Sequence, residues 1–310
     1  MSAVTPSTMV SPTTEASRKA WALLVFTTLI WGANAVAARL AVGEVSPMAM
    51  TGGRWVICCV ALWLTARGQI RQHRRALLPH WRRIVLMGTF GFTGFNALFY
   101  TAAHHTTAIN IAIIQGTIPV LVLVGSLFFF RTRIGWLQAV GVALTLAGIA
   151  VVASRGDLAV LAQLAFNIGD VWILIACVLY AGYTMGLRGR PAVPGIVFFA
   201  AMAAVACLSS LPLLAWEVAS GQFIVPTATG LALMAFVGLL PSFVTQLTFI
   251  RAVELIGPSR AGVFLNLVPI FGPLLAVIVL GEPLSPYHAV ALVLVLGGIA
   301  VAEHLGARRR

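Results

Sequence analysis

The sequence predicts an all-α integral membrane protein of ten transmembrane helices, arranged as two five-helix repeats. Of its 310 residues, 60% are hydrophobic and 9% are charged, whereas soluble domains carry roughly 25% charged residues. Ten apolar stretches are each long enough to cross a bilayer, which takes about 20 residues of helix. The second half of the chain repeats the first, and this repeat divides the ten stretches into two sets of five.

The two halves resemble each other at a nearly constant offset. Residues 138–151 align with residues 288–301 with eight of fourteen positions identical, and Pro119 aligns with Pro269. Because each repeat holds an odd number of spans, we expect the second copy to lie inverted in the membrane. Inverted repeats are typical of secondary transporters, whose substrate site lies between the repeats near the middle of the bilayer.

Short loops separate the predicted spans. We place the spans near residues 20–42, 47–66, 83–103, 107–130, 134–153, 168–187, 195–218, 229–252, 258–280 and 285–305. This predicts a first repeat at 18–154 and a second at 155–307, followed by a basic segment at 308–310. Residues 1–17 are rich in Ser, Thr and Pro, which predicts disorder, and they lack the basic region of a signal peptide.

The basic residues predict the orientation in the membrane. With the N-terminus in the cytoplasm, 17 of the 20 Lys and Arg residues fall on the inner side, and Arg39, Arg54 and Arg155 fall outside. The positive-inside rule therefore predicts cytoplasmic termini and a bacterial-type inner (plasma) membrane. The formal charge of +12 belongs to this bias and is not gathered on one folded face. We therefore expect no nucleic-acid partner.

Three segments carry a resemblance to a known family. They are the stretch WGANAVAARLAV at 31–42, the spans that hold Pro119 and Pro269, and the stretch LGEPLSPYHAVALVLVLGGIAVAEHLG near the end. With ten spans in an inverted repeat, the chain resembles the EamA branch of the drug/metabolite transporter superfamily, and within it the YddG-type exporters of aromatic amino acids. The Gly-Glu pair that ends the family's fourth span is present as Gly281-Glu282, whereas the first repeat has Arg131-Thr132.

Several classes of function lack their chemistry in this sequence. We expect no charged side chain at mid-span, where insertion would cost about 2.5–3.5 kcal/mol. The first span has no acid of the kind that couples small multidrug exporters to protons, and phosphate or nucleotide-sugar carriers would need Lys or Arg facing the cavity. No GxSxG occurs, and the four cysteines show no CxxC spacing. The sequence therefore predicts no catalytic residue, no metal site and no cofactor.

Neutral polar and aromatic residues within the spans are the candidates for substrate binding. They are Trp31, Asn34, Asn96, Tyr100, Gln115, Tyr180, Tyr183, Gln246, Phe264 and Asn266. Amides facing lipid are costly, so we expect these residues to face a cavity lined by spans 1, 3, 4, 6, 8 and 9. Buried amides also bridge helices, at about 0.6 kcal/mol each, and this remains the alternative for any one of them. A cavity of amides and rings suits a zwitterion with an apolar side chain.

Other residues have predicted roles in gating or packing. Pro119 and Pro269 are candidate hinges, because a proline tends to kink its helix. Arg39 and Arg188 close spans 1 and 6 as candidate gating residues, or alternatively as cations that favour a helix C-terminus. Pro241 is interpreted as a packing residue. Spans 5 and 10 are expected to form a scaffold through small residues, among them Gly141, Ala147, Gly148, Ala291, Gly297 and Gly298.

The predicted function is a secondary transporter that works by alternating access without obligate proton coupling. Amino acids, aromatic and apolar ones first, are the expected substrates, and the resemblance implies export. A nucleoside, a purine or a lipophilic drug would also suit amides and rings. A membrane enzyme or a scaffold without transport is the alternative from another class. The expected partners are the small-molecule substrate and the bilayer, with the protein a monomer or a homodimer.

Overall fold

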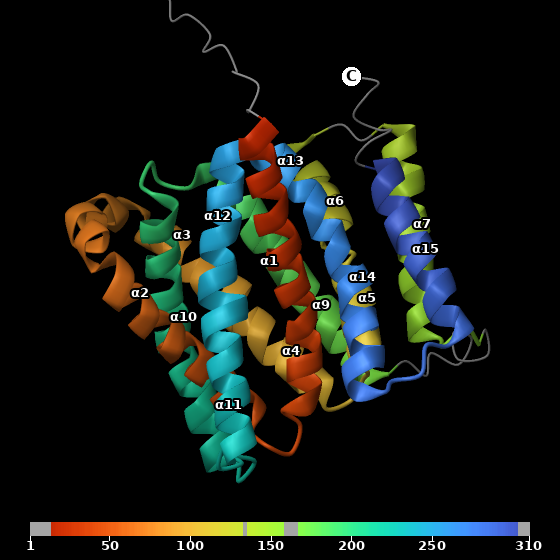
Figure 1. Cartoon of the computed structure of the whole chain (residues 1–310), viewed down its shortest axis with the longest axis horizontal. Helices are drawn as coiled ribbons and strands as arrows, with labels where there is room; N and C mark the ends of the chain where they lie inside the picture. The colour runs from red at the N-terminus through yellow and green to blue at the C-terminus, as the bar shows by residue number, and fades with distance from the viewer. Residues whose placement is uncertain (1–13, 133–134, 158–166, 303–310) are drawn as a thin grey trace, which may run out of the picture.

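The computed structural model describes residues 14–132, 135–157 and 167–302, which form a bundle of helices (Figure 1). The α-helices are α1 (Thr14–Leu40), α2 (Pro47–Leu77), α3 (Trp81–Leu86), α4 (Phe95–Ala103), α5 (Ala108–Gln115), α6 (Ile118–Phe130), α7 (Trp136–Ala153), α9 (Ile168–Gly186), α10 (Gly195–Ala219), α11 (Ala228–Val237), α12 (Thr245–Ile256), α13 (Pro258–Val263), α14 (Val268–Leu275) and α15 (Pro286–Ala300). Residues 1–13 and 303–310, which hold most of the predicted disordered segment and the basic C-terminus, lie outside the described residues.

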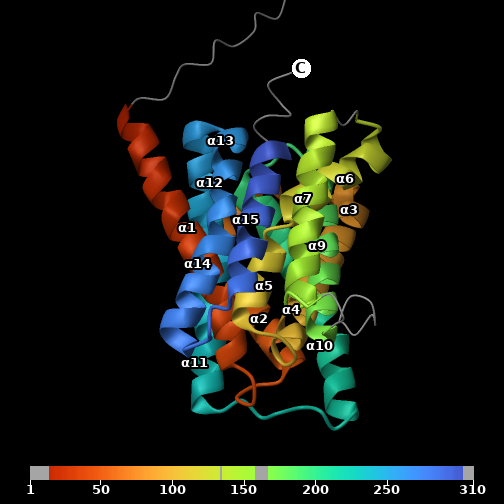
Figure 2. The ribbon, with the colours of Figure 1, turned by 90° about the vertical axis from the view of Figure 1, so that its right-hand side faces the viewer.

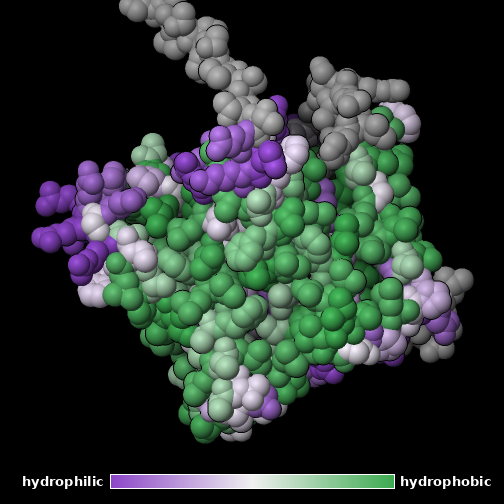
Figure 3. Space-filling view, viewed as in Figure 1, coloured by the Kyte–Doolittle hydropathy of each residue, from purple (hydrophilic) through white to green (hydrophobic). Residues whose placement is uncertain are grey.

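Eight helical stretches of the described chain are long and apolar enough to cross a membrane. One of them, Pro47–Ala103, has 57 residues. This stretch turns back at the 3-10 segment η1 (Leu78–His80), as the contact between α2 and α4 shows. α15 is apolar but shorter than the eight. The sides of the bundle expose apolar side chains, green in Figure 3, so the chain is an all-helical multi-pass membrane protein.

The predicted spans agree with the helices to within a few residues at most ends, with two corrections. Residues 14–17 belong to α1 and are helical, whereas we predicted disorder for them. α2 continues to Leu77, well past the predicted end of its span at residue 66. The extension carries exposed Arg67, Arg71, Arg74 and Arg75. These charges end the apolar span without ending the helix, because arginine is a good helix former.

The two repeats interlock through equivalent contacts. α1 packs against α12 and α14 of the second repeat, and its counterpart α9 packs against α4 and α6 of the first. α2 packs against α10, and α7 packs against α15, as Figure 2 shows for the second pair. The repeat seen in the sequence is therefore also present in the packing.

Small residues bring α7 and α15 into close contact, as predicted for spans 5 and 10. A Cβ atom on Gly298 would lie 2.6 Å from the carbonyl oxygen of Gly141, and one on Gly148 would lie 3.0 Å from that of Ala291. Gly297 differs, because a Cβ there would meet nothing within 4 Å. The helix contact therefore uses Gly298 and not its neighbour.

Two π-helical segments stand at equivalent places in the repeats. They are η2 (Met87–Gly94), between α3 and α4, and η4 (Gly238–Val244), between α11 and α12. A third π-helical segment, η6 (Ala276–Leu280), follows α14. The chain also has two further short 3-10 segments, η3 (Leu187–Gly189) and η5 (Phe264–Leu267). π-Helical turns are rare and frequently occur at functional sites.

Two carboxylates of the second repeat cap helices of the first. Glu217 is buried and accepts hydrogen bonds from the Met48 and Ala49 amides at 3.0 and 3.2 Å, at the start of α2. Glu282 accepts from the Ala108 and Ile109 amides at 2.9 and 3.0 Å, at the start of α5. Each negative charge meets the positive end of a helix dipole. Glu282 of the Gly281-Glu282 pair therefore has a structural role as the cap of α5. This role needs an acid in the second repeat only.

Candidate substrate-binding site

A cavity of about 150 Å³ lies between the two repeats. Since one water molecule needs about 10–15 Å³ by the same measure, the cavity has room for a small molecule. Nine of the residues predicted to bind substrate or act as hinges line it: Trp31, Asn34, Asn96, Gln115, Tyr180, Gln246 and Asn266, with the two prolines Pro119 and Pro269. Their roles in binding and gating remain predictions.

The wall of the cavity is built from both repeats at equivalent positions. Asn96 and Gln246 both line it, and so do Pro119 and Pro269. The π-helical segments η2 and η4 contribute as well, for example through the equivalent residues Gly91 and Pro241. Pro241 therefore lines the cavity, which corrects its interpretation as packing alone.

The helices that line the cavity include all six spans predicted to do so. Two further helices contribute: α2 through Arg54 and Trp55, and α10 through Phe199. α7 and α15 supply no lining residue. This agrees with their assignment to the scaffold.

Three of the predicted binding residues lie outside the cavity wall. Tyr183 packs on the ring of Phe92, with centroids 5.0 Å apart, and Phe264 packs near the start of α1. Tyr100 lies behind the wall, where its hydroxyl meets Arg54. The side chains of these three residues point into packed helix interfaces.

The two predicted gating arginines also lie away from the cavity. Arg39 donates a hydrogen bond to the carbonyl of Ala103 at 2.7 Å, at the end of α4. Arg188 lies over the ring of Phe130, with its guanidinium carbon 4.5 Å from the ring centroid. Arg39 thus meets a helix C-terminus, the alternative that the sequence left open, although the helix is α4 and not its own.

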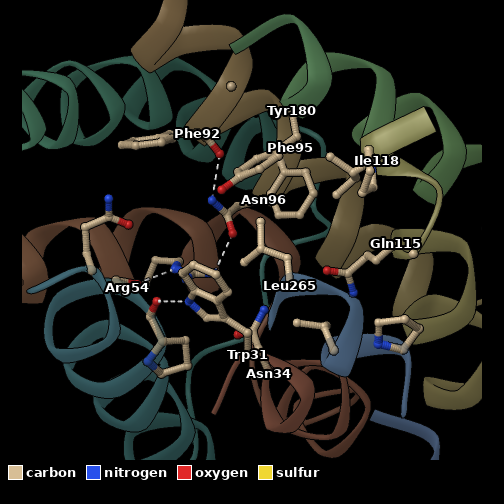
Figure 4. A pocket seen from close by; sticks show the side chains of 18 of the residues that line it. Trp31, Asn34, Arg54, Phe92, Phe95, Asn96, Gln115, Ile118, Tyr180 and Leu265 are labelled. Carbon is tan, nitrogen blue, oxygen red and sulfur yellow. Dashed lines mark hydrogen bonds between the residues drawn. The ribbon is translucent and has the colours of Figure 1, made fainter. Parts of the chain in front are cut away.

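Arg54 corrects the expectation that no Lys or Arg faces the cavity. We counted it on the outer side, but it is only 5% exposed and lines the cavity (Figure 4). Its Nε donates to the hydroxyl of Ser242 at 2.9 Å. Its Nη1 donates to the hydroxyl of Tyr100 at 2.6 Å and to Oδ1 of Asn96. A lone arginine inside an otherwise apolar span was the signal in the sequence.

Aromatic rings form much of the remaining wall. The ring of Phe95 lies 5.1 Å from that of Tyr180, and Trp55 stacks on Phe92 with centroids 4.8 Å apart. In the view of Figure 4, Arg54 and Gln115 lie on opposite sides, with the rings of Trp31 and Phe95 between them. The cavity thus combines one cation, several amides and apolar rings. An amphiphilic small molecule fits such a wall.

The amides of the cavity differ in how far the protein satisfies them. Asn96 is committed at both ends, because its Nδ2 donates to the Phe92 carbonyl at 2.7 Å and its Oδ1 accepts from Arg54. The side-chain amide of Gln246 lines the cavity and makes no hydrogen bond to the described residues. Gln115 makes one long bond, from Nε2 to the Ile111 carbonyl at 3.4 Å. The amide groups of Gln246 and Gln115 are therefore the more available to a substrate.

A cavity between two interlocking helical repeats in a multi-pass membrane protein is the arrangement of a membrane transporter. The sequence profile of the EamA-like transporter family matches residues 18–154 and 167–302. The chain therefore belongs to this family, and it is a transporter and not an enzyme.

Curated relatives match nearly the whole chain. The uncharacterized transporter YyaM of Bacillus subtilis is 23% identical over 91% of this chain and 92% of its own. A probable terminal-alkyne amino-acid exporter of Streptantibioticus cattleyicolor is 27% identical over 94% of this chain and 96% of its own. The uncharacterized inner membrane transporter YedA of Escherichia coli K12 is 26% identical over 85% and 84%.

A crystal structure of another protein has the same fold. Its chain is 21% identical and aligns with a TM-score of 0.63, covering 94% of this chain and 99% of that chain. This likeness concerns the fold alone.

Proposed function

We propose that this transporter carries amino acids, aromatic and apolar ones first, out of the cytoplasm by alternating access. The observation that carries the proposal is the composition of the cavity wall, in which equivalent amides and rings of both repeats surround one space. Amides and hydroxyls suit the polar end of an amino acid, and rings suit its apolar side chain. The probable terminal-alkyne amino-acid exporter among the relatives supports the same substrate class.

The proposed topology has ten crossings, in repeats bounded near 18–154 and 155–307, with the second repeat inverted. Two observations support it: Pro47–Ala103 has the length of two spans, and both ends of the described chain lie at one end of the bundle (Figure 1). The exposed arginines at the end of α2 and in α3 gather at that same end (Figure 3). The positive-inside rule then favours cytoplasmic termini, and the inner-membrane relative favours a bacterial-type inner membrane.

We further propose that transport follows the substrate's own gradient. No Asp, Glu, His or Lys occurs among the residues described as lining the cavity. Pro119 and Pro269, in equivalent helices against the cavity, remain the proposed hinges. Direction of transport rests on the family resemblance.

The test is uptake of radiolabelled phenylalanine, threonine and adenosine into liposomes that hold the purified protein, without an ion gradient. We expect flux of phenylalanine, lost in Gln246→Leu and kept in Gln222→Leu, an exposed glutamine outside the cavity. Flux of adenosine but not of phenylalanine would overturn the amino-acid proposal. Accumulation against a gradient only under an imposed proton gradient would overturn the proposal on coupling.

A further inference from the structure

Arg54 brings a positive charge into the cavity that the described protein does not neutralise. Its three hydrogen-bond partners, Ser242, Asn96 and Tyr100, are all neutral. Among residues 14–132, 135–157 and 167–302, no carboxylate lies within ion-pair distance of the Arg54 guanidinium. The ion pair in these ranges joins Arg251 to Glu254 and is exposed. The cavity wall contains no Asp or Glu within these ranges either.

The buried acids Glu217 and Asp170 and the half-buried Glu282 have hydrogen-bond partners elsewhere. Glu217 and Glu282 cap α2 and α5. Asp170 accepts hydrogen bonds from Thr106 at 2.5 Å and from Asn110 at 3.3 Å. None of these three lines the cavity. The charge of Arg54 is therefore a property of the cavity and not half of a structural ion pair.

The guanidinium keeps donors available on the side that the protein leaves open. Arginine has five N–H donors, and the bonds to Ser242, Asn96 and Tyr100 use those on Nε and Nη1. Nη2 bonds none of the described residues. A buried cation without a counter-charge is costly, and a carboxylate pairs with a planar guanidinium by charge-assisted hydrogen bonds. A ligand that brings a carboxylate would relieve that cost.

We propose that Arg54 is the group that binds the carboxylate of the substrate, and that the ligand's ammonium is not required. The inference rests on the proposed function and narrows its substrate class to small amphiphilic carboxylates. Gln246 and Gln115 can accept from an ammonium, but as neutral groups they hold it less strongly than a carboxylate would. A net monoanion neutralises the cavity, whereas a zwitterion leaves its net charge at plus one. Carboxylates that lack the ammonium therefore bind at least as well as the corresponding amino acids.

Three compounds with one apolar body test the proposal: phenylalanine, 3-phenylpropionate and phenylalaninamide. Binding is measured on the full chain as a shift in melting temperature in detergent and as competition for phenylalanine uptake. We expect 3-phenylpropionate to bind at least as tightly as phenylalanine, and phenylalaninamide at least about tenfold more weakly. Equal binding of the amide would overturn the inference and leave the transport of amino acids standing. Binding of 3-phenylpropionate without uptake of phenylalanine would support the role of Arg54 and overturn the transport of amino acids. No binding of any of the three compounds would overturn both proposals.

Variants of Arg54 separate a binding role from a structural one. Arg54→Gln should weaken both carboxylates at least about tenfold. It should bind phenylalaninamide at least as well as the parent does, because the charge that repels the ligand's ammonium is removed. The melting temperature without ligand should change little, because removal of an unpaired buried charge offsets the loss of its hydrogen bonds to Ser242, Asn96 and Tyr100. A lower melting temperature with equal weakening of all three compounds would mean that Arg54 is structural. Arg54→Lys, which keeps the charge but not the fork, should retain the preference for carboxylates at reduced affinity. Loss of that preference in the lysine variant would overturn the proposal, and exposed Arg251→Gln is the matched control.

Discussion

The indole Nε1 of Trp31 donates a hydrogen bond to the backbone carbonyl of Pro241 at 3.1 Å, joining the first helix of one repeat to a π-helical segment of the other. The same carbonyl also accepts from the hydroxyl of Thr245 at 2.7 Å. The Trp31 ring packs on Phe249, with centroids 5.6 Å apart. Trp31 therefore both lines the cavity and connects the two repeats.

Two substitutions of Trp31 separate these roles. Trp31→Phe keeps a ring but removes the donor, and the carbonyl retains Thr245, so the free energy of unfolding should fall by no more than about 1 kcal/mol. Trp31→Ala removes the ring from the wall, and phenylalanine flux should fall at least about tenfold. Flux into liposomes and melting in detergent measure the two effects. Trp136→Phe, at a tryptophan 63% exposed, should change neither. Full flux in Trp31→Ala would remove Trp31 from the proposed site.

The contact between α7 and α15 predicts opposite effects at two adjacent glycines. A Cβ on Gly298 would lie 2.4 Å from Oγ1 of Thr145 and 2.6 Å from the Gly141 carbonyl. Gly298→Ala should therefore cost about 1–3 kcal/mol by overpacking. Gly297→Ala meets open space and should be neutral or gain up to about 1 kcal/mol, because alanine is the better helix former. Melting temperatures of the two variants decide, and equal effects would contradict the observed packing.

The cap on α2 predicts a large difference between two glutamates. Glu217→Ala would leave two amides and the Ser46 hydroxyl without their buried acceptor. Each such group costs about 1–3 kcal/mol, so a marked loss of thermal stability is expected. Glu254→Ala removes an exposed ion pair with Arg251, worth about 0–1 kcal/mol. Comparable melting temperatures for the two variants would show that the cap contributes little.

The repeat and the walls of the cavity could be predicted from the sequence because both leave local signals. Apolar runs of fixed length give the spans, and amides within them, such as Asn96 and Gln246, have few places to face other than the interior. The direction in which a side chain points was less predictable. Tyr183 and Phe264 point into packed helix interfaces and not into the cavity.

Arg54 was misplaced because its environment is assembled from distant parts of the chain. It stands near the start of its span, where an arginine ordinarily reaches the membrane surface. Its partners Asn96, Tyr100 and Ser242 lie 42, 46 and 188 residues away. Only the folded arrangement shows that these neutral groups hold the guanidinium inward. The capping of α2 by Glu217 escaped prediction for the same reason, since acceptor and donors are about 170 residues apart.

Amides within the spans have two different environments in this protein, and Asn110 and Gln246 represent them. Asn110 accepts from His288 Nε2 at 3.2 Å and donates to both carboxylate oxygens of Asp170 at 3.3 Å, so it connects α5, α9 and α15. The tautomer of His288 follows from its Nδ1, which accepts from the Ser285 amide. The side-chain amide of Gln246 instead lines the cavity without a hydrogen-bond partner among the described residues. Bridging and the proposed substrate binding therefore fall on different side chains.

This division predicts that the two amides fail in opposite ways. Asn110→Leu leaves the buried Asp170 and His288 without their shared partner, at about 1–3 kcal/mol for each unsatisfied group, so the melting temperature should fall. Flux per folded molecule should be kept, because Asn110 does not line the cavity. Gln246→Leu should keep the melting temperature and lose flux. Initial rates normalised to folded protein measure both, and a loss of flux in Asn110→Leu equal to that in Gln246→Leu would contradict the separation, since the cavity would then extend to the bridge between α5, α9 and α15.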